Sequence, residues 1–384
     1  MSALYLAVTV SLVLTTFNLL SLAIAMGRLR ARSRLPTPAA DSEPVSIVRP
    51  VCGAEPFIEE TLASGFSLDY PAYELIFCVA DANDPVVPVV RRFMAAHPHV
   101  SARLLVGDDK ISKNPKLNNC IKGWQAARHD WIVLADSNVL MPADYVQHLK
   151  AGWRANTGLV CATPIGSRPS GFWAEVECAF LNTLQARWQY VGESLGLGFA
   201  QGKSMLWRRE FLDQRGGLHA LASEIAEDAA ATKLIRQAGL HVHLVTAPFE
   251  QPLGARTFRE VWKRQARWAR LRRVTFPLFF APEILSGVGV PLAAAVYASA
   301  VGGYPAAALV PTVLILWYGA EAALAASKGW HLSWRFPLTC LARDAVMILI
   351  WFYAWVGSNV VWRGNAMSIQ SKTAVRLEER ESTA

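Results

Sequence analysis

The segment YELIFCVADANDP, residues 73–85, contains the features that decide the fold. Its first part, residues 73–80, is a continuous apolar run of the kind found in strands buried on both faces. Asp81 follows this run directly, and a helix is predicted over residues 86–96. A buried strand, an acidic residue and a helix therefore succeed one another without a long loop.

The same alternation continues on both sides of this segment. Further strands are predicted over residues 45–51, 102–106 and 131–135, and further helices over residues 59–66 and 118–127. Buried strands that alternate with helices indicate an α/β domain with a doubly wound, mainly parallel sheet. Ligands of such sheets bind beyond the carboxyl ends of the strands, where Asp81 and Asp136 (in LADSNV) are expected. Neither a GxGxxG motif nor a Walker P-loop occurs, which argues against a dinucleotide oxidoreductase or an ATPase.

Two later motifs complete an ordered set of polar sites. Asp228 stands in IAEDAA at the start of a predicted helix, and residues 263–270 read KRQARWAR. A single Asp commonly serves a turn or an N-cap, and Asp228 alone would be interpreted in that way. The complete set suits sugar transfer from a nucleoside diphosphate, because three carboxylates can hold the nucleoside, hold a divalent cation and accept a proton. The helix dipole would favour the ionised form of Asp228, as a base requires.

Hydropathy predicts several membrane segments. Hydrophobic residues make up 53% of the 384 residues and charged residues 18%, and the apolar excess is local. Residues 2–27 are uncharged, long enough to cross a bilayer and without a cleavage signal, so a retained anchor helix is expected. Residues 284–320, interrupted by GGYP, predict two spans with a tight turn, and residues 345–362 predict a third. Burial of a charged Glu321 in lipid would cost free energy unless the carboxylate were paired. The consecutive residues Arg343 and Asp344 are the candidates for this pairing.

The charges that flank these segments give conflicting evidence on orientation. The anchor is followed by Arg28, Arg30, Arg32 and Arg34, which place the next domain in the cytoplasm by the positive-inside rule. Three later spans would put the C-terminal tail outside. That tail contains Arg363, Lys372 and Arg376, which favour the cytoplasm, so one hydrophobic segment is suspected to be re-entrant.

The net charge of +8 and the pI of 9.3 do not indicate a nucleic-acid partner. The basic residues cluster beside membrane segments, over residues 28–34 and 256–273, where anionic lipid headgroups are the expected partner. Residues 256–273 also carry interleaved aromatic side chains, as a membrane-surface helix does. The six cysteines form no CxxC pair, so reduced thiols are expected.

A family resemblance rests on motifs that occur in one order between residues 45 and 285. They are DYP at 69–71, NPK at 114–116 with NN at 118–119, DS at 136–137, GGL at 216–218, IAED at 225–228, and RW at 267–268 with LR at 271–272. In this order they resemble ceramide glucosyltransferases, a membrane-bound branch of the inverting GT-A glycosyltransferases, in a bacterial-type form. The resemblance implies a GT-A domain with one N-terminal and about three C-terminal transmembrane helices.

The resemblance also implies roles for individual residues. Asp81 would contact the uridine of a UDP-sugar, Asp136 would bind a divalent cation, Mg²⁺ or Mn²⁺, and Asp228 would be the general base. Lys116 and Asn118 would contact the donor, although a helix-capping turn explains them equally well.

The QxxRW motif is expected to close the donor site. Gln265, Arg267 and Trp268 would do so, with Arg267 near the diphosphate and Trp268 as an aromatic wall. Two departures from the family pattern matter. The metal motif reads Asp136-Ser137-Asn138 rather than Asp-x-Asp, and Ala229-Ala230 stands where an aromatic residue is usual.

The expected organisation follows from these assignments. It comprises an anchor over residues 1–27, a basic linker over 28–44, a cytoplasmic GT-A domain over 45–255, a basic interfacial helix over 256–281, transmembrane segments over 282–364 and a polar tail over 365–384. The expected protein is a multi-pass protein of the bacterial inner membrane or an equivalent membrane.

The expected reaction is transfer of a hexose, glucose above others, from a UDP-sugar to the primary hydroxyl of ceramide with inversion. The alternatives are another lipid acceptor, such as a hopanoid or a diacylglycerol, or UDP-galactose as donor. A processive polysaccharide synthase would need more spans for its polymer channel, and an inactive membrane-binding module would not need Asp136, Asp228 and QxxRW.

Overall fold

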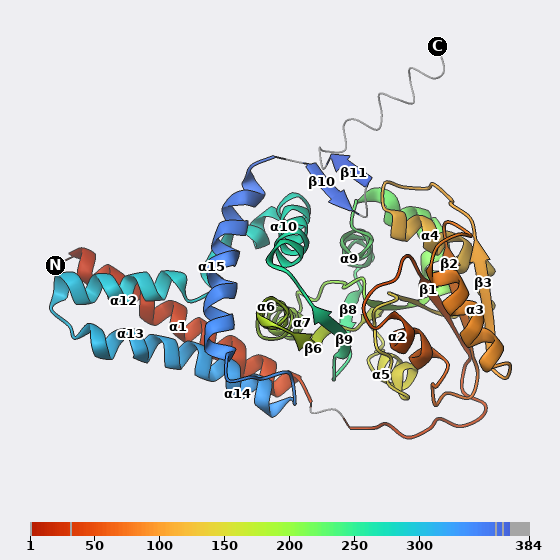
Figure 1. The fold of residues 1–384 in the computed structure, drawn as a ribbon, viewed down its shortest axis with the longest axis horizontal. Coiled ribbons are helices and arrows are strands. Elements are labelled where there is room, and N and C mark those ends of the chain that lie inside the picture. The colour runs from red at the N-terminus through yellow and green to blue at the C-terminus, as the bar shows by residue number, and fades with distance from the viewer. Residues whose placement is uncertain (1, 31–32, 358, 363–364, 369–384) are drawn as a thin grey trace, which may run out of the picture.

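The structure is a computed structural model that describes residues 2–30, 33–357, 359–362 and 365–368. An α/β domain occupies one end of the molecule, and long helices project from it along the longest axis (Figure 1). The two parts are joined by helices that pack against both of them.

In the described part of the chain, one seven-stranded sheet has the order β3-β2-β1-β4-β7-β5-β8. Its strands are β1 (Val45–Pro50), β2 (Tyr73–Val79), β3 (Ser101–Val106), β4 (Trp131–Ala135), β5 (Thr157–Cys161), β7 (Ser204–Arg208) and β8 (His241–Leu244). Strands β3, β2, β1 and β4 are parallel, β5 and β8 are parallel, and β7 runs antiparallel between β4 and β5. The predicted mainly parallel sheet is therefore confirmed.

Helices cover both faces of this sheet. Helices α2 (Ile58–Gly65), α3 (Val86–Ala96) and α5 (Tyr145–Ala151) share one core with Leu75 and Phe77 of β2. Helices α4 (Pro115–Ala126), α7 (Arg187–Ser194) and α9 (Glu227–Gln237) share the other core with Ile76 and Cys78. Successive side chains of a strand point to opposite faces, so the apolar run of β2 supplies both cores.

A layer of helices and a small sheet joins this domain to the long helices. It contains the parallel pair β6 (Pro164–Ser170) and β9 (Phe249–Ala255), then α6 (Phe172–Ala179), η1 (Phe180–Ala186) and α10 (Phe258–Thr275). Helix α10 is the predicted basic helix, and it begins with a capping box between Thr257 and Glu260. Short elements complete the chain: α8 (Arg209–Asp213), η2 (Gly217–Ser223), α11 (Pro277–Phe280), η3 (Ala281–Ser286), β10 (Asn359–Trp362) and β11 (Asn365–Ser368).

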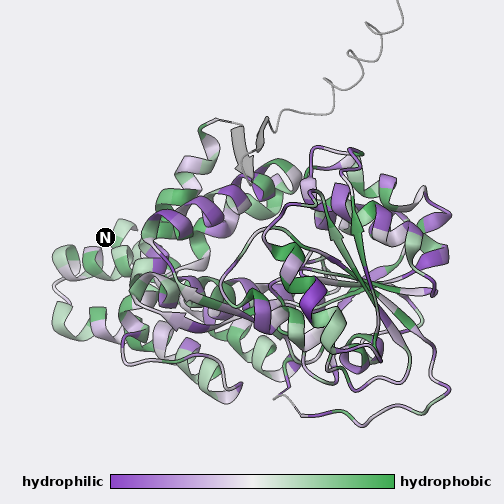
Figure 2. Cartoon of the chain, turned by 45° about the vertical axis from the view of Figure 1, so that its right-hand side comes forward, coloured by the Kyte–Doolittle hydropathy of each residue, from purple (hydrophilic) through white to green (hydrophobic). Residues whose placement is uncertain are grey.

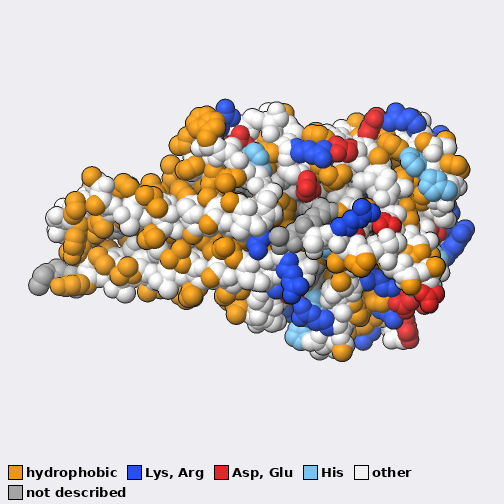
Figure 3. Space-filling view, turned by 90° about the horizontal axis from the view of Figure 1, so that it is seen from below, with side chains coloured by type: hydrophobic (Ala, Val, Ile, Leu, Met, Phe, Trp, Pro, Cys, Tyr) orange, Lys and Arg blue, Asp and Glu red, His pale blue; other side chains and the backbone are white. Residues whose placement is uncertain are grey.

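Three helical stretches among the described residues are long and apolar enough to cross a membrane: Ser2–Arg28 (α1), Ala306–Ser327 and Phe336–Trp355 (α15). The second comprises α13 (Ala306–Leu314), η4 (Ile315–Gly319) and α14 (Ala320–Ser327). A fourth is added if the bent pair Pro277–Ser286 and Gly289–Gly302, the latter α12, forms one span. These helices are predominantly hydrophobic in colour (Figure 2), and the projecting end carries almost no charged side chains on the face seen in Figure 3.

The predicted turn between two spans is confirmed, because α12 ends at Gly302 and α13 begins at Ala306. The predicted span over residues 345–362 is wrong in its bounds. Helix α15 begins at Phe336 and ends at Trp355, and β10 follows it. Of the basic residues used for orientation, Arg32, Arg363, Lys372 and Arg376 lie outside the described residues.

Ion pairing explains why α15 includes charged residues that interrupt the hydrophobic run in the sequence. Arg343 donates to Glu321 at 2.6 and 3.1 Å and to Asp344 at 2.8 Å, and all three are buried. Asp344 also accepts hydrogen bonds from the backbone N–H of Val288 and from Tyr318. The predicted pairing of Glu321 is confirmed, and it holds α14, α15 and the start of α12 together.

Candidate active site

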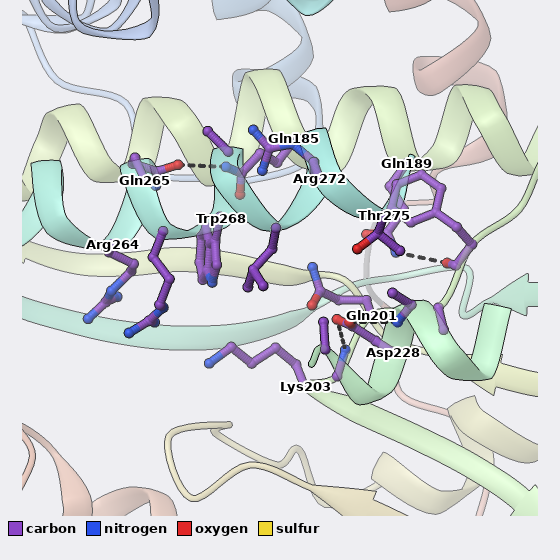
Figure 4. A pocket seen from close by; sticks show the side chains of 18 of the residues that line it. Gln185, Gln189, Gln201, Lys203, Asp228, Arg264, Gln265, Trp268, Arg272 and Thr275 are labelled. Atoms are coloured by element: carbon purple, nitrogen blue, oxygen red, sulfur yellow. Dashed lines mark hydrogen bonds between the residues drawn. The ribbon is translucent and has the colours of Figure 1, made fainter. Parts of the chain in front are cut away.

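One cavity of about 1670 Å³ lies between the carboxyl ends of the strands, α10 and the membrane helices. Its lining includes every residue predicted for the site: Asp81, Lys116, Asn118, Asp136, Asp228, Gln265, Arg267 and Trp268. In Figure 4, α10 lies on one side of this space, with Arg264 and Trp268 projecting into it, while Lys203 and Asp228 lie on the opposite side. The fold thus assembles the motifs in one place.

Asp136 lies directly after β4 and is held by two lysines. Its Oδ1 is 2.7 Å from Nζ of Lys116, and its Oδ2 is 2.9 Å from Nζ of Lys203. These two cations hold the pKa of Asp136 well below its usual range, although burial acts in the opposite direction. The loop that follows β4 is fixed by the buried Arg49 of β1, which donates to the backbone carbonyls of residues 136, 137 and 139.

Lys116 is the centre of a buried charge network. It stands in the first turn of α4, where Asn114 is the N-cap and accepts from the backbone N–H of Lys116. Its Nζ is 2.6 Å from Glu227 and 2.7 Å from Asp136, and these carboxylates raise the pKa of Lys116 against the effect of burial. Lys116 is therefore a permanent cation that links α4, β4 and α9.

Asp228 lies in the first turn of α9, but it is not the N-cap, which is Ala226. Its Oδ2 accepts from the backbone N–H of Gly202 at 3.2 Å, and its Oδ1 accepts from that of Ala229 at 2.8 Å. Burial and the neighbouring Glu227 carboxylate raise the pKa of Asp228 to about 7, although Lys116 and the backbone donors act against them. A carboxyl with this pKa can accept a proton near neutral pH.

Asp81 and Asn118 differ in their exposure and in the hydrogen bonds that their side chains make. Asp81, after β2, is exposed, and its Oδ1 accepts from the backbone N–H of Asn83 at 2.9 Å. Asn118 is buried, and its amide oxygen and nitrogen are both bonded to Ser112. Asn118 therefore holds the loop before α4, while Lys116 faces the charged centre.

The QxxRW motif lies on α10 at the opposite side of the cavity. Gln265 accepts from Nε2 of Gln185 at 2.8 Å, which ties α10 to η1 (Figure 4). Trp268 packs against the buried cluster of Cys178, Leu181 and Leu253. Arg264 donates to the buried Glu177 at 2.7 Å. These contacts fix the position of α10 over the sheet.

The GT-A fold implies a divalent cation, and the residues present accommodate one only together with a ligand. Among the described residues, no group of three or more His, Cys, Asp or Glu side chains could hold a metal ion. In nucleotide sites, Mg²⁺ takes one or two carboxylates and completes its shell with phosphates and water. The single carboxylate of Asp136, which lines the cavity, fits that arrangement, and Lys116 and Lys203 lie beside it.

Several residues of the centre were not predicted as site residues. Lys203 stands in QGKSM before β7, a strand that the sequence pattern did not reveal. A Lys between a Gly and a strand is a weak sequence signal for a site residue. Its partner Asp136 follows a different strand, so the sequence does not show that the two are close. Glu227 was noticed only as the neighbour of Asp228, and Arg49 was hidden in an otherwise apolar strand.

Comparisons with known proteins find similarity to ceramide glucosyltransferases. Ceramide glucosyltransferase 1 of Caenorhabditis elegans is 27% identical over 342 residues, which cover 87% of this chain and 73% of the relative. Ceramide glucosyltransferase of Komagataella phaffii is 42% identical over 118 residues, 30% of this chain and 23% of the relative.

The fold has a solved counterpart in the mannosyltransferase PcManGT from Pyrobaculum calidifontis, determined in complex with GDP-Man and Mn²⁺. The TM-score is 0.53 at 19% identity, over 89% of this chain and 98% of that structure. The likeness supports the GT-A architecture expected from the sequence. Residues 5–375 match glycosyl transferase family 21, and the chain therefore belongs to that family.

Proposed function

We propose that this protein transfers glucose from UDP-glucose to the primary hydroxyl of ceramide, with inversion, and so makes a β-glucosylceramide. The observation that carries the proposal is the continuity of the cavity. At one end it is lined by Asp81, Lys116, Asp136 and Asp228, and at the other by apolar side chains of membrane helices, such as Phe17 and Trp317. A polar donor and a lipid acceptor can therefore meet in one continuous cavity.

The donor would bind at the charged end. Asp81, exposed beyond β2, would hold the uridine, and Lys116, Lys203 and Arg267 would face the diphosphate. A cation at Asp136, Mg²⁺ or Mn²⁺, would offset the negative charge that develops on the leaving diphosphate. Lys116 and Lys203, which lie beside Asp136, would add positive charge at the same point.

Asp228 would act as the base. The oxygen of the acceptor hydroxyl forms a bond to the anomeric carbon while the bond from that carbon to the diphosphate breaks. Asp228 takes the hydroxyl proton, and UDP leaves with the electron pair. One displacement with one base inverts the configuration, and the backbone N–H groups of residues 202 and 229 orient the carboxylate.

The α/β domain would face the cytoplasm, as the basic residues after α1 predict. An anionic membrane surface was expected as a partner of α10, but its last basic residues have partners within the chain. Arg270 and Arg273 donate to the carbonyls of Val356 and Gly357, and Arg272 pairs with Glu283. Support for an anionic lipid partner therefore rests on the exposed Arg259 and Lys263.

The test is an assay of purified protein with UDP-glucose, Mg²⁺ and a panel of lipid acceptors. We expect a hexose on ceramide with the β configuration, identified by NMR, and equimolar release of UDP. Asp228→Asn protein is the matched control. Preferential transfer to a diacylglycerol or a hopanoid, or from UDP-galactose, would overturn the assigned substrates while leaving the reaction class intact.

A further inference from the structure

A short apolar segment between α7 and β7 ends at the candidate base. This segment, the strap, comprises residues 195–202 and has the sequence LGLGFAQG. Leu195 is 62% exposed and Leu197 is 46% exposed, and both leucines line the cavity. Because these large apolar side chains line the cavity and are also accessible from outside, they mark one of its openings. The donor chemistry uses neither of them.

Helix α9 holds the strap along one of its faces. Three polar side chains spaced four residues apart lie on this face and line the cavity: Asp228, Thr232 and Arg236. Oδ2 of Asp228 accepts from the backbone N–H of Gly202 at 3.2 Å, and Oγ1 of Thr232 accepts from that of Ala200 at 2.8 Å. Nη2 of Arg236 donates to the backbone carbonyls of residues 197 and 198 at 3.1 and 3.3 Å. The strap therefore runs along α9 from its last turn to its first.

These bonds set the distance between the leucines and the base. The stretch of α9 from Asp228 to Arg236 is about 12 Å long, at 1.5 Å per residue of an α-helix. The carbonyl of Leu197 is bonded to Arg236, so this leucine lies about 12 Å along the helix axis from Asp228. A lipid of ordinary chain length with its hydroxyl at Asp228 would extend beyond that distance.

The leucine end of the strap lies at the membrane surface. Arg28, the last residue of the membrane helix α1, pairs with Glu193 at 2.5 and 3.0 Å, and Leu195 follows two residues later. Phe17, about three turns earlier in α1, is exposed and lines the same cavity. Apolar side chains therefore line the cavity both at the membrane surface and within the hydrophobic part of α1, where hydrocarbon chains can pass into the bilayer.

We propose that Leu195 and Leu197 form the entrance through which the lipid acceptor reaches Asp228, and that they contact its hydrocarbon chains during transfer. This inference rests on the proposed function and deepens it, because it names residues that favour a long-chain acceptor. The bonds to α9 hold the entrance at a fixed distance from the base. A long-chain acceptor therefore contacts the leucines, whereas an analogue with two short chains reaches Asp228 without contacting them.

The experiment compares long-chain ceramide in vesicles with a soluble ceramide analogue whose two chains are too short to reach the entrance. The measured quantity is the ratio of kcat/KM for the long-chain acceptor to kcat/KM for the short-chain one. Leu195→Ser/Leu197→Ser should lower this ratio about tenfold relative to wild type, because the chains lose apolar contacts, and should keep the wild-type Kd for UDP. Leu195→Met/Leu197→Met retains apolar side chains of similar size and should keep the wild-type ratio.

Leu278→Ser is the matched control for attachment to the bilayer. Leu278 of α11 is 88% exposed and lies outside the lining of the cavity, so its replacement should keep the wild-type ratio. An equal fall of the ratio in Leu278→Ser would mean that exposed leucines only attach the protein to lipid, and it would overturn the inference. An unchanged ratio in Leu195→Ser/Leu197→Ser would also overturn it, while transfer to ceramide by the wild type still supports the proposed function. Absence of transfer to ceramide by the wild type would overturn both.

Discussion

At the scale of single residues, the position of Asp228 decides how the site works. The sequence alone allowed an N-cap, but the structure gives that position to Ala226 and turns the Asp228 carboxylate toward Gly202. Glu227, one residue earlier, is committed to Lys116 and Asn114. The two adjacent acids therefore have different environments, one paired and one available as a base.

The first prediction concerns pH. Because burial and Glu227 raise the pKa of Asp228 to about 7, the fraction of ionised base should rise through neutral pH. We expect kcat to increase from pH 6 to pH 8. Asp228→Asn should reduce kcat by about 10² to 10⁴ at all pH values while UDP binds with nearly unchanged Kd. Near-normal turnover by the Asn variant would show that Asp228 is not the base.

The same carboxyl has a consequence for stability. A carboxyl whose pKa is higher in the folded than in the unfolded protein binds its proton more tightly when folded. Between the ordinary Asp value of about 4 and about 7, stability should therefore fall as pH rises. Asp228→Asn removes this loss of stability. The Tm of the variant minus the Tm of the wild type should therefore be larger at pH 8 than at pH 5, as measured by thermal unfolding at both pH values.

The second prediction concerns the cation. Because Asp136 is the sole carboxylate assigned to the metal and carries two lysine partners, free protein should bind Mn²⁺ weakly. With UDP present, the phosphates should supply the missing ligands, and Mn²⁺ should bind at least tenfold more tightly, as measured by EPR titration. Asp136→Ala should abolish this increase. Full activity in EDTA would exclude the cation from the reaction.

At the scale of helices and strands, the sequence predicted what local patterns determine. The strands β2 and β4 and the helix α3 have the expected positions because a continuous apolar run or a helical spacing identifies each of them. Strand β7, which Lys203 directly precedes, was not predicted because it is inserted antiparallel between strands that are distant from it in sequence. The start of α15 was not predicted because the charge of Arg343 is offset by Glu321, on another helix, and by the neighbouring Asp344.

The third prediction concerns the joint between α10 and η3. Arg272 pairs with Glu283 through two hydrogen bonds of 2.7 and 2.9 Å, beside the cavity. We expect Arg272→Glu to lower activity on ceramide because two like charges then separate the elements. The double variant Arg272→Glu/Glu283→Arg should recover most of the activity, because the pair is restored in reverse.

The comparison distinguishes this joint from a lipid contact. If Arg272 acted on anionic lipid, the double variant would be as impaired as the single one, and the loss would depend on the lipid charge of the vesicles. Recovery at equal vesicle composition supports the intramolecular role. Arg259→Glu, at an exposed position of the same helix, is the matched control for lipid charge, and it should be impaired on anionic vesicles only.

At the scale of the whole molecule, α15 explains the conflict between the number of predicted spans and the basic tail. Both of its ends are bonded to helices of the layer that joins the α/β domain to the long helices. Before its start, Ser333 donates to Glu175 of α6 at 2.6 Å, and after its end, the carbonyl of Val356 accepts from Arg270 of α10 at 2.9 Å. In Figure 1, α15 runs across the direction of α1, α12 and α13 rather than along it. A helix with both ends bonded to this one layer is expected to lie along it rather than to cross the membrane away from it.

The last prediction is therefore that α1, the bent pair Pro277–Ser286 and Gly289–Gly302, and the stretch from α13 to α14 cross the membrane, and that α15 lies at its cytoplasmic surface. This arrangement places the tail with Lys372 and Arg376 in the cytoplasm, in agreement with the positive-inside rule. Single cysteines can test it in a Cys52→Ser background, because Cys52 is the exposed cysteine among the described residues. In intact cells, an impermeant maleimide should label Tyr304→Cys, between α12 and α13, but neither Trp334→Cys nor Ser382→Cys. Permeabilised cells should allow all three to react. Labelling of Ser382→Cys from outside, with Trp334→Cys protected, would mean that α15 crosses the bilayer, and its bonds to Glu175 and Arg270 could then not exist together.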